Sequence, residues 1–274
     1  MSSSSVKTLV IVALVLINVF FLTFIVIDTV SVARNERETL ENACAVVKSS
    51  GISIDPDSIK AGGELRTMRT VRVNEAEMVI ARAILGQTDM TTQGVKFFYE
   101  NPGMGKAEFR SGCDFDINLN EGVITSPNGA IRTAKKLLRR MKLETSECFL
   151  SSDNGNETVT TLCAYRGASI FNCMIEFLFH DGSLQTIKGK YVTGVEAAEN
   201  GNGISSVGTA LVTFLAAVNR GEFECSSIYG VEAGYQQSVV GPFGEGVIHP
   251  AWLISTDTGQ YIIDDSSGEI RMVA

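Results

Sequence analysis

The side chains that most often carry out catalysis are few in this sequence and stand far apart along the chain. His180 precedes an Asp-Gly pair and His249 precedes a proline, and neither histidine belongs to a zinc-binding or nucleophile motif. Asp264 and Asp265 are adjacent, so in a strand their side chains would point to opposite faces, and we interpret them as turn acids rather than paired catalytic acids. The sequence therefore predicts a protein that is not an enzyme and that uses no metal or cofactor.

Six cysteines form the next group with possible chemistry. They are Cys44, Cys113, Cys148, Cys163, Cys173 and Cys225. An even number permits disulfides outside the cytoplasm, whereas the lack of any Cys-x-x-Cys pair argues against a zinc site or a redox motif. Cys163 and Cys173 lie on the two arms of one predicted hairpin, so they either pair with each other or remain buried thiols.

A cluster of basic residues is the main candidate for a binding site in the C-terminal part. Six of the eleven residues from 132 to 142 are basic, although the chain as a whole has 23 Lys+Arg against 31 Asp+Glu. The six are Arg132, Lys135, Lys136, Arg139, Arg140 and Lys142. Such a cluster is typical of the solvated face of an amphipathic helix. In the functional interpretation it is a contact for an acidic partner or for an anionic polymer of the cell envelope.

The first element that would position these residues is an apolar segment near the N-terminus. Residues 8–27 include 17 apolar residues and no charge, and twenty helical residues span about 30 Å, the thickness of the hydrocarbon core of a bilayer. We expect residues 1–28 to form a short cytoplasmic tail and a single transmembrane helix, with the remainder outside the cell. A cleaved signal peptide is the alternative, but its apolar core is usually only about 7–15 residues long.

One polar residue, Asn18, lies near the centre of the apolar segment. An amide in lipid lacks hydrogen-bond partners, so such a residue tends to face another helix, although lipid also tolerates a single Asn at modest cost. The residues that share its helix face are Ile11, Leu14, Val15, Phe21, Leu22 and Ile25. We predict that Asn18 and these six residues form an interface with a partner helix inside the membrane.

The rest of the chain alternates amphipathic helices with short strands. Capping residues predict helix starts at Asn74 with Glu77, at Ser126 with Pro127, and at Ser205 or Ser206. Each helix is followed by an antiparallel run of strands, predicted at residues 94–100, 106–111 and 114–119, then 158–165, 169–180 and 184–192, then 222–231, 248–256, 260–264 and 269–273. The expected fold class is α+β, built from units of one helix plus an antiparallel meander.

This pattern also suggests a division of the chain into segments. We expect a helical stalk at 29–50, a membrane-proximal α+β unit at 51–125 and distal α+β units at 126–274. Whether the stalk transmits motion to the membrane or packs on the domain stays open at this point. The mean hydropathy of +0.15 owes much to the apolar residues 8–27, so the remainder is not a polytopic membrane protein. The apolar content of the remainder argues against a disordered chain, and the net charge of -8 argues against a basic nucleic-acid binder.

Several segments resemble the YycH/YycI proteins of Gram-positive bacteria. The matching segments are 7–11 and 16–20 in the anchor, 230–235 with an "ExGY" pattern, 250–254 with "PAW", 259–264 with "Y-x-x-D", and 268–270 with "GEI". YycI is the more similar of the two by length and layout. The four serines 2–5 stand where the family often has an acidic residue and a tryptophan.

The resemblance implies a single-pass membrane protein with an extracellular α+β domain. It also implies assembly with a YycH-like membrane protein and with the WalK-type sensor histidine kinase that controls cell-wall metabolism. Homodimers or heterodimers of the chain are compatible with this assembly. The expected function is thus a non-enzymatic regulator that acts on the kinase through transmembrane and extracellular contacts. The alternatives are a PepSY-like ligand-binding or protease-inhibiting module, tethered or secreted, and an envelope hydrolase if the fold brings a histidine beside an acid and a nucleophile.

Overall fold

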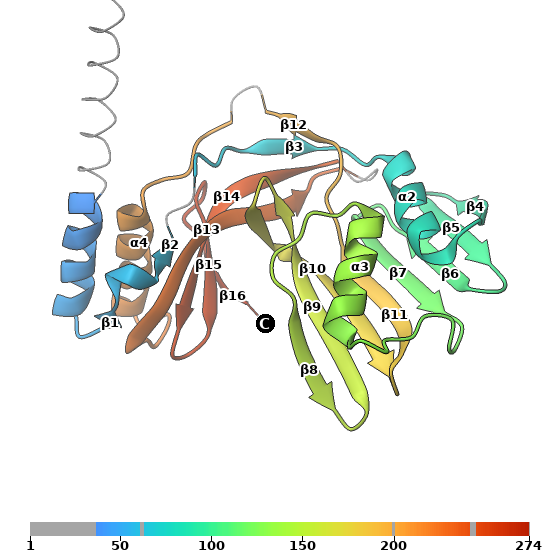
Figure 1. The fold of residues 1–274 in the computed structure, drawn as a ribbon. Helices are drawn as coiled ribbons and strands as arrows, with labels where there is room; N and C mark the ends of the chain where they lie inside the picture. The colour runs from blue at the N-terminus through green and yellow to red at the C-terminus, as the bar shows by residue number, and fades with distance from the viewer. Residues whose placement is uncertain (1–36, 61–62, 199–200, 242–244, 274) are drawn as a thin grey trace, which may run out of the picture.

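The computed structural model of the chain describes residues 37–60, 63–198, 201–241 and 245–273 (Figure 1). It is a mixed α+β fold in which strands predominate. Within the described residues, no helix combines the length and apolar character needed to cross a bilayer. The predicted transmembrane helix and its proposed interface around Asn18 lie outside the described residues.

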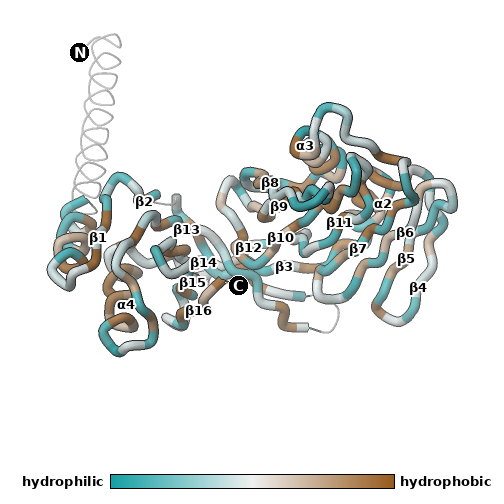
Figure 2. The backbone as a smooth tube through the Cα atoms, turned by 90° about the horizontal axis from the view of Figure 1, so that it is seen from below, coloured by the Kyte–Doolittle hydropathy of each residue, from teal (hydrophilic) through white to brown (hydrophobic). Residues whose placement is uncertain are grey.

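The larger sheet has eight antiparallel strands in the order β8-β9-β10-β11-β7-β6-β5-β4. Their bounds are Asp89–Gln93 (β4), Lys96–Asn101 (β5), Gly105–Phe109 (β6), Asp114–Leu119 (β7), Phe149–Asp153 (β8), Asn156–Tyr165 (β9), Ala168–His180 (β10) and Ser183–Lys190 (β11). Helices α2 (Asn74–Leu85) and α3 (Ala130–Met141) cover one side of this sheet and leave the other side open (Figures 1 and 2).

Two copies of one unit build the larger sheet. Each copy is a helix followed by four strands, α2 with β4 to β7 and α3 with β8 to β11. The last strands of the two copies, β7 and β11, pair in the middle, so the first strands, β4 and β8, become the two edges. The predicted arrangement of one helix and one antiparallel meander is therefore correct for both units. The sequence missed β4 and β8, whose residues are all exposed and so lack the alternation that marks a half-buried strand.

A third helix-and-meander unit forms most of the second sheet. Helix α4 (Val207–Asn219) precedes β13 (Ser227–Val239), β14 (Gly246–Thr256), β15 (Gln260–Asp264) and β16 (Ile270–Met272). Shorter strands extend this sheet: β1 (Ser53–Ile54) and β2 (Ile59–Lys60), separated by the 3₁₀ turn η1 (Pro56–Ser58), pair with β13, while β3 (Met68–Thr70) pairs with β14 and with β12 (Val195–Ala197). The strands predicted at residues 248–256 and 260–264 are found at almost the same positions.

The two sheets meet where β10 lies parallel to β13, at the single pairing of Ile170 with Tyr235. Asn172 strengthens this joint because its side-chain amide donates to the Gln237 carbonyl at 2.7 Å and accepts from the Gln237 amide at 2.8 Å. Gly234 is required here, since a Cβ at this position would lie 2.5 Å from the Ser169 carbonyl oxygen. The larger sheet contains strands from both sides of the predicted boundary after residue 125, so the sheets divide the chain differently from the predicted segments.

The helix starts differ from the sequence prediction in two cases. Val73 rather than Asn74 precedes α2 and makes no capping bond, while Glu77 is fully buried in an ion pair. Helix α3 begins after Gly129, and Ser126 donates its hydroxyl to the Gly182 carbonyl instead of capping the helix. The capping residue of α4 was predicted correctly, because the Ser206 hydroxyl accepts a bond from the Thr209 amide at 3.2 Å.

The described part of the predicted stalk, a helix at residues 37–49, packs on the second sheet's unit. Ala43, Cys44 and Val47 are buried on one face of this helix. Gly208 at the start of α4 lets the two helices approach closely, since a Cβ there would lie 3.0 Å from the Thr39 side chain. Of the two alternatives for this segment, packing on the domain is the one seen for residues 37–49 (Figure 1).

Candidate binding site

Helix α3 separates its apolar and basic residues onto different faces. Ala134, Leu137, Leu138 and Met141 are buried against the sheet, which fixes the orientation of the helix. All six residues of the predicted basic cluster remain exposed, five of them in α3 and Lys142 at its C-terminal cap. Within the described residues, none of these six side chains has an ion pair or a hydrogen bond. The predicted cluster is therefore a set of cations without carboxylate partners in the described part of the chain.

A groove of about 850 Å³ runs between α3 and the edge of the larger sheet, and we call it the α3 groove. Its basic wall consists of Arg132, Lys135 and Arg139, which are spaced three and four residues apart and so share one side of α3. The remaining lining residues are Asn128, Gly129, Ala130, Ile131, Leu138, Leu143, Thr145, Ser146, Cys148, Leu150 and Glu157. Lys136 and Arg140 lie on the same helix but do not line the groove.

Strand β8 forms the outer border of the α3 groove. It pairs with β9 on one side, and no other described strand pairs with its outer edge. Leu150 stands opposite the buried Val159, so its side chain faces α3 and lines the groove. Phe149 points to the opposite side of the sheet and is 66% exposed, while Leu150 is 44% exposed. Apolar side chains on an unpaired edge strand are uncommon in a surface that meets only water.

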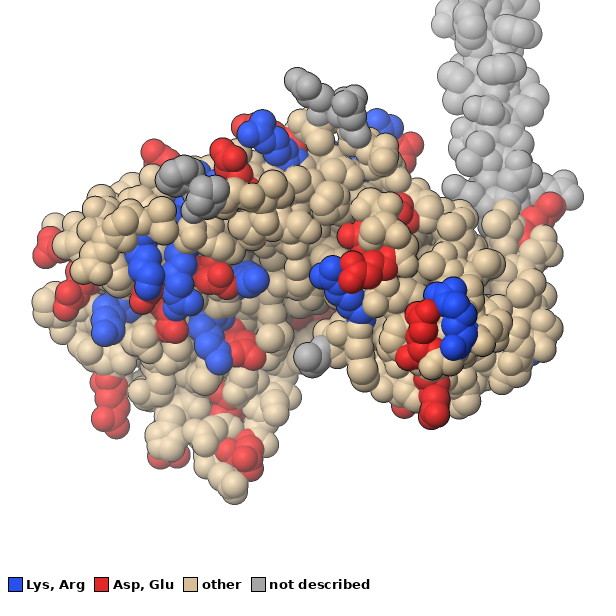
Figure 3. All heavy atoms as spheres, turned by 180° about the vertical axis from the view of Figure 1, so that it is seen from behind, with Lys and Arg blue, Asp and Glu red and all other residues tan. Residues whose placement is uncertain are grey.

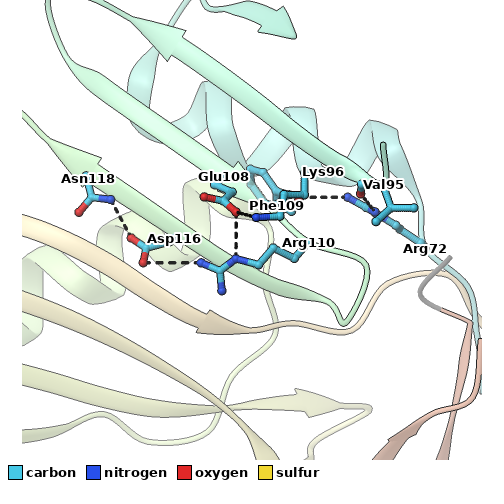
Figure 4. Close-up of polar contacts among 8 residues, drawn as sticks. All are labelled: Arg72, Val95, Lys96, Glu108, Phe109, Arg110, Asp116 and Asn118. Atoms are coloured by element: carbon cyan, nitrogen blue, oxygen red, sulfur yellow. Dashed lines mark hydrogen bonds and ion pairs between the residues drawn. The ribbon is translucent and has the colours of Figure 1, made fainter. Parts of the chain in front are cut away.

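The side of the larger sheet that faces away from α2 and α3, which we call the open sheet face, is also strongly charged (Figure 3). Many of its charges form ion pairs with residues of the same or the neighbouring strand, and Figure 4 shows those around Glu108. Glu108 accepts from Lys96 at 2.8 Å and from Arg110 at 3.2 Å, and Arg110 reaches Asp116 at 3.9 Å. Two more cross-strand pairs are Lys188 with Glu176 at 3.1 Å and Lys190 with Asp114 at 4.0 Å. The hydrogen bond from Lys96 lowers the pKa of Glu108.

A buried ion pair ties α2 to the larger sheet. Arg72 is 7% exposed and Glu77 is fully buried, and the Arg72 Nε donates to the Glu77 Oε1 at 2.5 Å. The Tyr191 hydroxyl donates to the same oxygen at 2.7 Å, and burial together with the nearby carboxylate raises the pKa of Tyr191. Arg72 also donates to the Val95 carbonyl and lies 4.7 Å from the centre of the Phe97 ring. The Arg72 and Glu77 charges satisfy each other, which is the pattern of a structural tie.

The cysteines of the predicted hairpin are thiols. The Cys163 Sγ donates to the Lys190 carbonyl at 3.3 Å, and the Cys173 Sγ donates to the Gln237 Oε1 at 2.9 Å. Burial raises the pKa of Cys163 to about 12 and raises the pKa of Cys173 well above its ordinary value. Of the two alternatives for this pair, the buried thiols are the ones found, and their high pKa values make them poor nucleophiles.

His249 lies within strand β14, opposite Gln236 of β13, whereas His180 and the adjacent aspartates lie where strands end in turns. His180 is exposed at the end of β10, where its Nδ1 meets Asn156 at 2.9 Å and its Nε2 meets Asp181 at 3.5 Å. Asp264 accepts three bonds within its own turn, and Asp265 accepts from the Ser205 amide and hydroxyl ahead of α4. The two carboxylates thus hold different segments, as the turn-acid interpretation predicted. Among the described residues, no group of three or more potential ligands is arranged to hold a metal ion.

Sequence reasoning identified the bases of the groove but not its sheet border. The hairpin between β8 and β9 has Asn154 and Gly155 at its turn, both with positive φ angles of 47° and 82°. An Asn-Gly pair is a strong sequence signal for a two-residue hairpin, so it could have revealed β8. The ion pair of Arg72 with Glu77 had no such signal, because nothing in the sequence shows that an acidic residue in the first turn of a helix is buried.

Comparisons with known proteins leave the family open. No protein-family model matches the chain, and no curated protein matches it. Among solved structures, the chain is similar to an uncharacterized protein from Eubacterium rectale ATCC 33656, with a TM-score of 0.49 and 9% identity over 77% of this chain and 87% of that one. It is also similar to the Bacillus megaterium YpeB C-terminal domain, with a TM-score of 0.37 and 13% identity over 75% of this chain and 99% of that one. Both scores and both identities are low, so neither likeness carries an argument about function.

Proposed function

We propose that this protein is a membrane-anchored, non-enzymatic regulator whose α+β domain binds an acidic partner protein through the α3 groove. The observation that carries the proposal is the contrast in charge pairing. Four bases of the open sheet face have acidic partners within the chain, namely Lys96, Arg110, Lys188 and Lys190, while Lys106 on the same face has none among the described residues. None of the six bases at residues 132–142 has an acidic partner among the described residues. Exposed cations beside an apolar border are suited to steer and hold a partner of opposite charge.

The resemblance to YycI supplies the identity of the regulated system in this proposal. The partners would be a WalK-type sensor histidine kinase and a YycH-like membrane protein, with the α+β domain outside the cell. The apolar segment at residues 8–27 would place Asn18 against a transmembrane helix of the kinase. A coupling free energy of about 1–3 kcal/mol between the contacts and the kinase is enough to shift a two-state equilibrium severalfold.

The proposal is tested by crosslinking the full chain in membranes of its natural host, followed by mass spectrometry of the captured proteins. We expect to recover a sensor histidine kinase and a YycH-like protein. Asn18→Leu should lower the kinase yield because it removes the polar contact within the membrane. Recovery of neither protein would overturn the regulatory proposal, and an unchanged yield with Asn18→Leu would overturn its intramembrane part.

A second experiment separates this proposal from a PepSY-like binding or inhibitory module, because the two differ in where the mature chain is found. A regulator of a membrane kinase stays in the membrane with its N-terminal segment intact. A mature chain that begins near Arg34 and accumulates in the culture medium would instead favour the secreted module. N-terminal sequencing of the protein from both fractions decides between them.

A further inference from the structure

We infer that the partner enters the α3 groove as an extended segment that adds a strand to β8, with acidic side chains facing α3. This inference rests on the proposed function, in which the α3 groove is the partner surface. It adds the conformation and the chemistry of the segment that binds there. Three features of the groove meet at one place: an unpaired strand edge, a wall of unpaired bases and apolar side chains on the edge strand itself.

The edge of β8 offers hydrogen-bonding groups at known positions. A two-residue turn makes Asp153 and Asn156 a hydrogen-bonded pair, and such pairs alternate along an antiparallel ladder. Phe149, Ser151 and Asp153 therefore bond to β9. Leu150 and Ser152 direct their amide N–H and carbonyl groups away from β9, toward the position that an added strand would occupy. An extended peptide gains main-chain hydrogen bonds there without any change in the larger sheet.

The side chains beside this edge define which peptide fits. On an added strand, alternate residues face the same side as Leu150, and on that side stand Arg132, Lys135 and Arg139. The seven-residue step from Arg132 to Arg139 covers about 10 Å along the helix, and alternate strand residues are about 7 Å apart, so two acidic side chains match the wall. Glu157, the acid that lines the groove, lies on β9, one strand further from the edge.

The other side of the added strand meets a different surface. Its residues would lie beside Phe149, which is 66% exposed and stands opposite Thr160 on the open sheet face. A partner segment in which acidic residues alternate with apolar residues therefore complements both sides of the edge. An anionic polymer of the cell envelope would use the bases but neither the edge amides nor Phe149, so the structure favours a peptide.

The test uses a labelled peptide in which glutamate alternates with valine, and it measures binding to the full chain in detergent by fluorescence anisotropy. The double variant Lys135→Gln/Arg139→Gln removes two bases of the groove wall. The matched control, Lys136→Gln/Arg140→Gln, removes two bases of the same kinds from the same helix but away from the groove. We expect the first variant to bind about tenfold more weakly and the control to bind within about twofold of the natural protein.

A second pair of measurements tests the strand addition separately from the charge. Ser152→Pro removes an outward N–H, and edge strands tolerate proline, so we expect a folded protein that binds about tenfold more weakly. A peptide N-methylated at alternate amides should bind equally weakly to the unmodified chain, which keeps the test decisive even if the proline variant does not fold.

Loss of binding in the groove variant, the proline variant and the methylated peptide supports the inference. If the bases matter but the proline and the methylation do not, the strand addition is wrong and the groove binds acidic chains through charge alone. Equal binding by all variants overturns the α3 groove as a peptide site. These outcomes do not depend on which proteins crosslink in membranes, so a failure here is distinct from a failure of the kinase proposal.

Discussion

The open sheet face and helix α3 lie on opposite sides of the larger sheet and are both charged, but they differ in ion pairing. On the open sheet face, the Glu108 carboxylate has two basic partners, Lys96 and Arg110, within 3.2 Å. On α3, Lys135 and Arg139 stand one helical turn apart with no carboxylate partner in the described chain, and like charges at this spacing repel each other. A paired surface is satisfied by the fold itself, whereas an unpaired surface of one sign is a cost to stability that binding can offset.

This comparison also explains why charge density by itself is a poor guide to function. The open sheet face is rich in charge, but most of its ion pairs join neighbouring strands, and such pairs contribute to sheet stability. Helix α3 has several basic residues and no acidic residue to pair with them. The informative observation is therefore the pairing of each charge, which depends on strand register and becomes visible only in three dimensions.

The largest expected effect on stability is at Glu77, which belongs to the buried ion pair with Arg72. Glu77→Ala would leave the Arg72 cation buried without its partner, and we expect a loss of about 3–5 kcal/mol in the free energy of unfolding. Chemical denaturation followed by the fluorescence of Trp252, the only tryptophan, measures the loss. Glu75→Ala, an exposed change in the same helical turn, is the control and should stay within about 0.5 kcal/mol. A small loss for Glu77→Ala would show that the pair does not stabilise the fold.

A smaller effect is expected on the open sheet face. Glu108→Gln removes the acceptor shared by Lys96 and Arg110, which are both partly exposed, so we expect a loss of about 0.5–1 kcal/mol in the free energy of unfolding. High salt should reduce this difference because it screens exposed charges. An unchanged free energy of unfolding would mean that these pairs contribute nothing, and the contrast with α3 would then be one of geometry only.

The same carboxylate gives a prediction for pH. The hydrogen bond from Lys96 lowers the pKa of Glu108 below its ordinary value of 4.5. A lowered pKa in the folded state means that the stabilisation is fully present above that ordinary value and is lost as the pH falls through the folded pKa. An NMR titration of the Glu108 side chain should show the lowered pKa in the natural protein and a higher one in Lys96→Gln. Identical titration curves would contradict the pairing.

The smallest effect on stability is expected on α3. Lys135→Gln/Arg139→Gln removes two unpaired cations, so the free energy of unfolding should change by less than about 0.5 kcal/mol, with a slight gain from relieved repulsion. Denaturation curves of this variant and of Lys136→Gln/Arg140→Gln should nearly coincide. A loss above 1 kcal/mol, on the order of a paired charge, would show that these bases do have partners within the chain and would remove the contrast.

Much of the fold could be predicted from the sequence, and the errors have a common physical cause. The helices around residues 130–141 and 207–219 and the long central strands have regular apolar patterns, and they lie close to their predicted positions. The two edge strands β4 and β8 are fully exposed, so no burial pattern marked them. The second sheet gathers β1 to β3 with β13 to β16, an arrangement fixed by long-range pairing that no local pattern encodes.

The candidate site was also predicted only in part. The six bases at residues 132–142 were evident from the sequence, and all six are exposed in the structure. Their division into three that line the α3 groove and three that do not depends on how the helix packs on β8 and β9. The interface predicted around Asn18 lies outside the described residues and stays a prediction.

The most direct test of the central claim compares two charge-matched variants of the full chain in membranes. Lys135→Gln/Arg139→Gln and Lys136→Gln/Arg140→Gln remove the same charge from the same helix, but only the first pair lines the α3 groove. Crosslinking yields of the proposed partner are measured for both variants and for the natural protein. We expect the groove variant to lose most of its partner crosslinks and the control to keep them. Equal yields for the two variants would contradict the α3 groove as the partner surface.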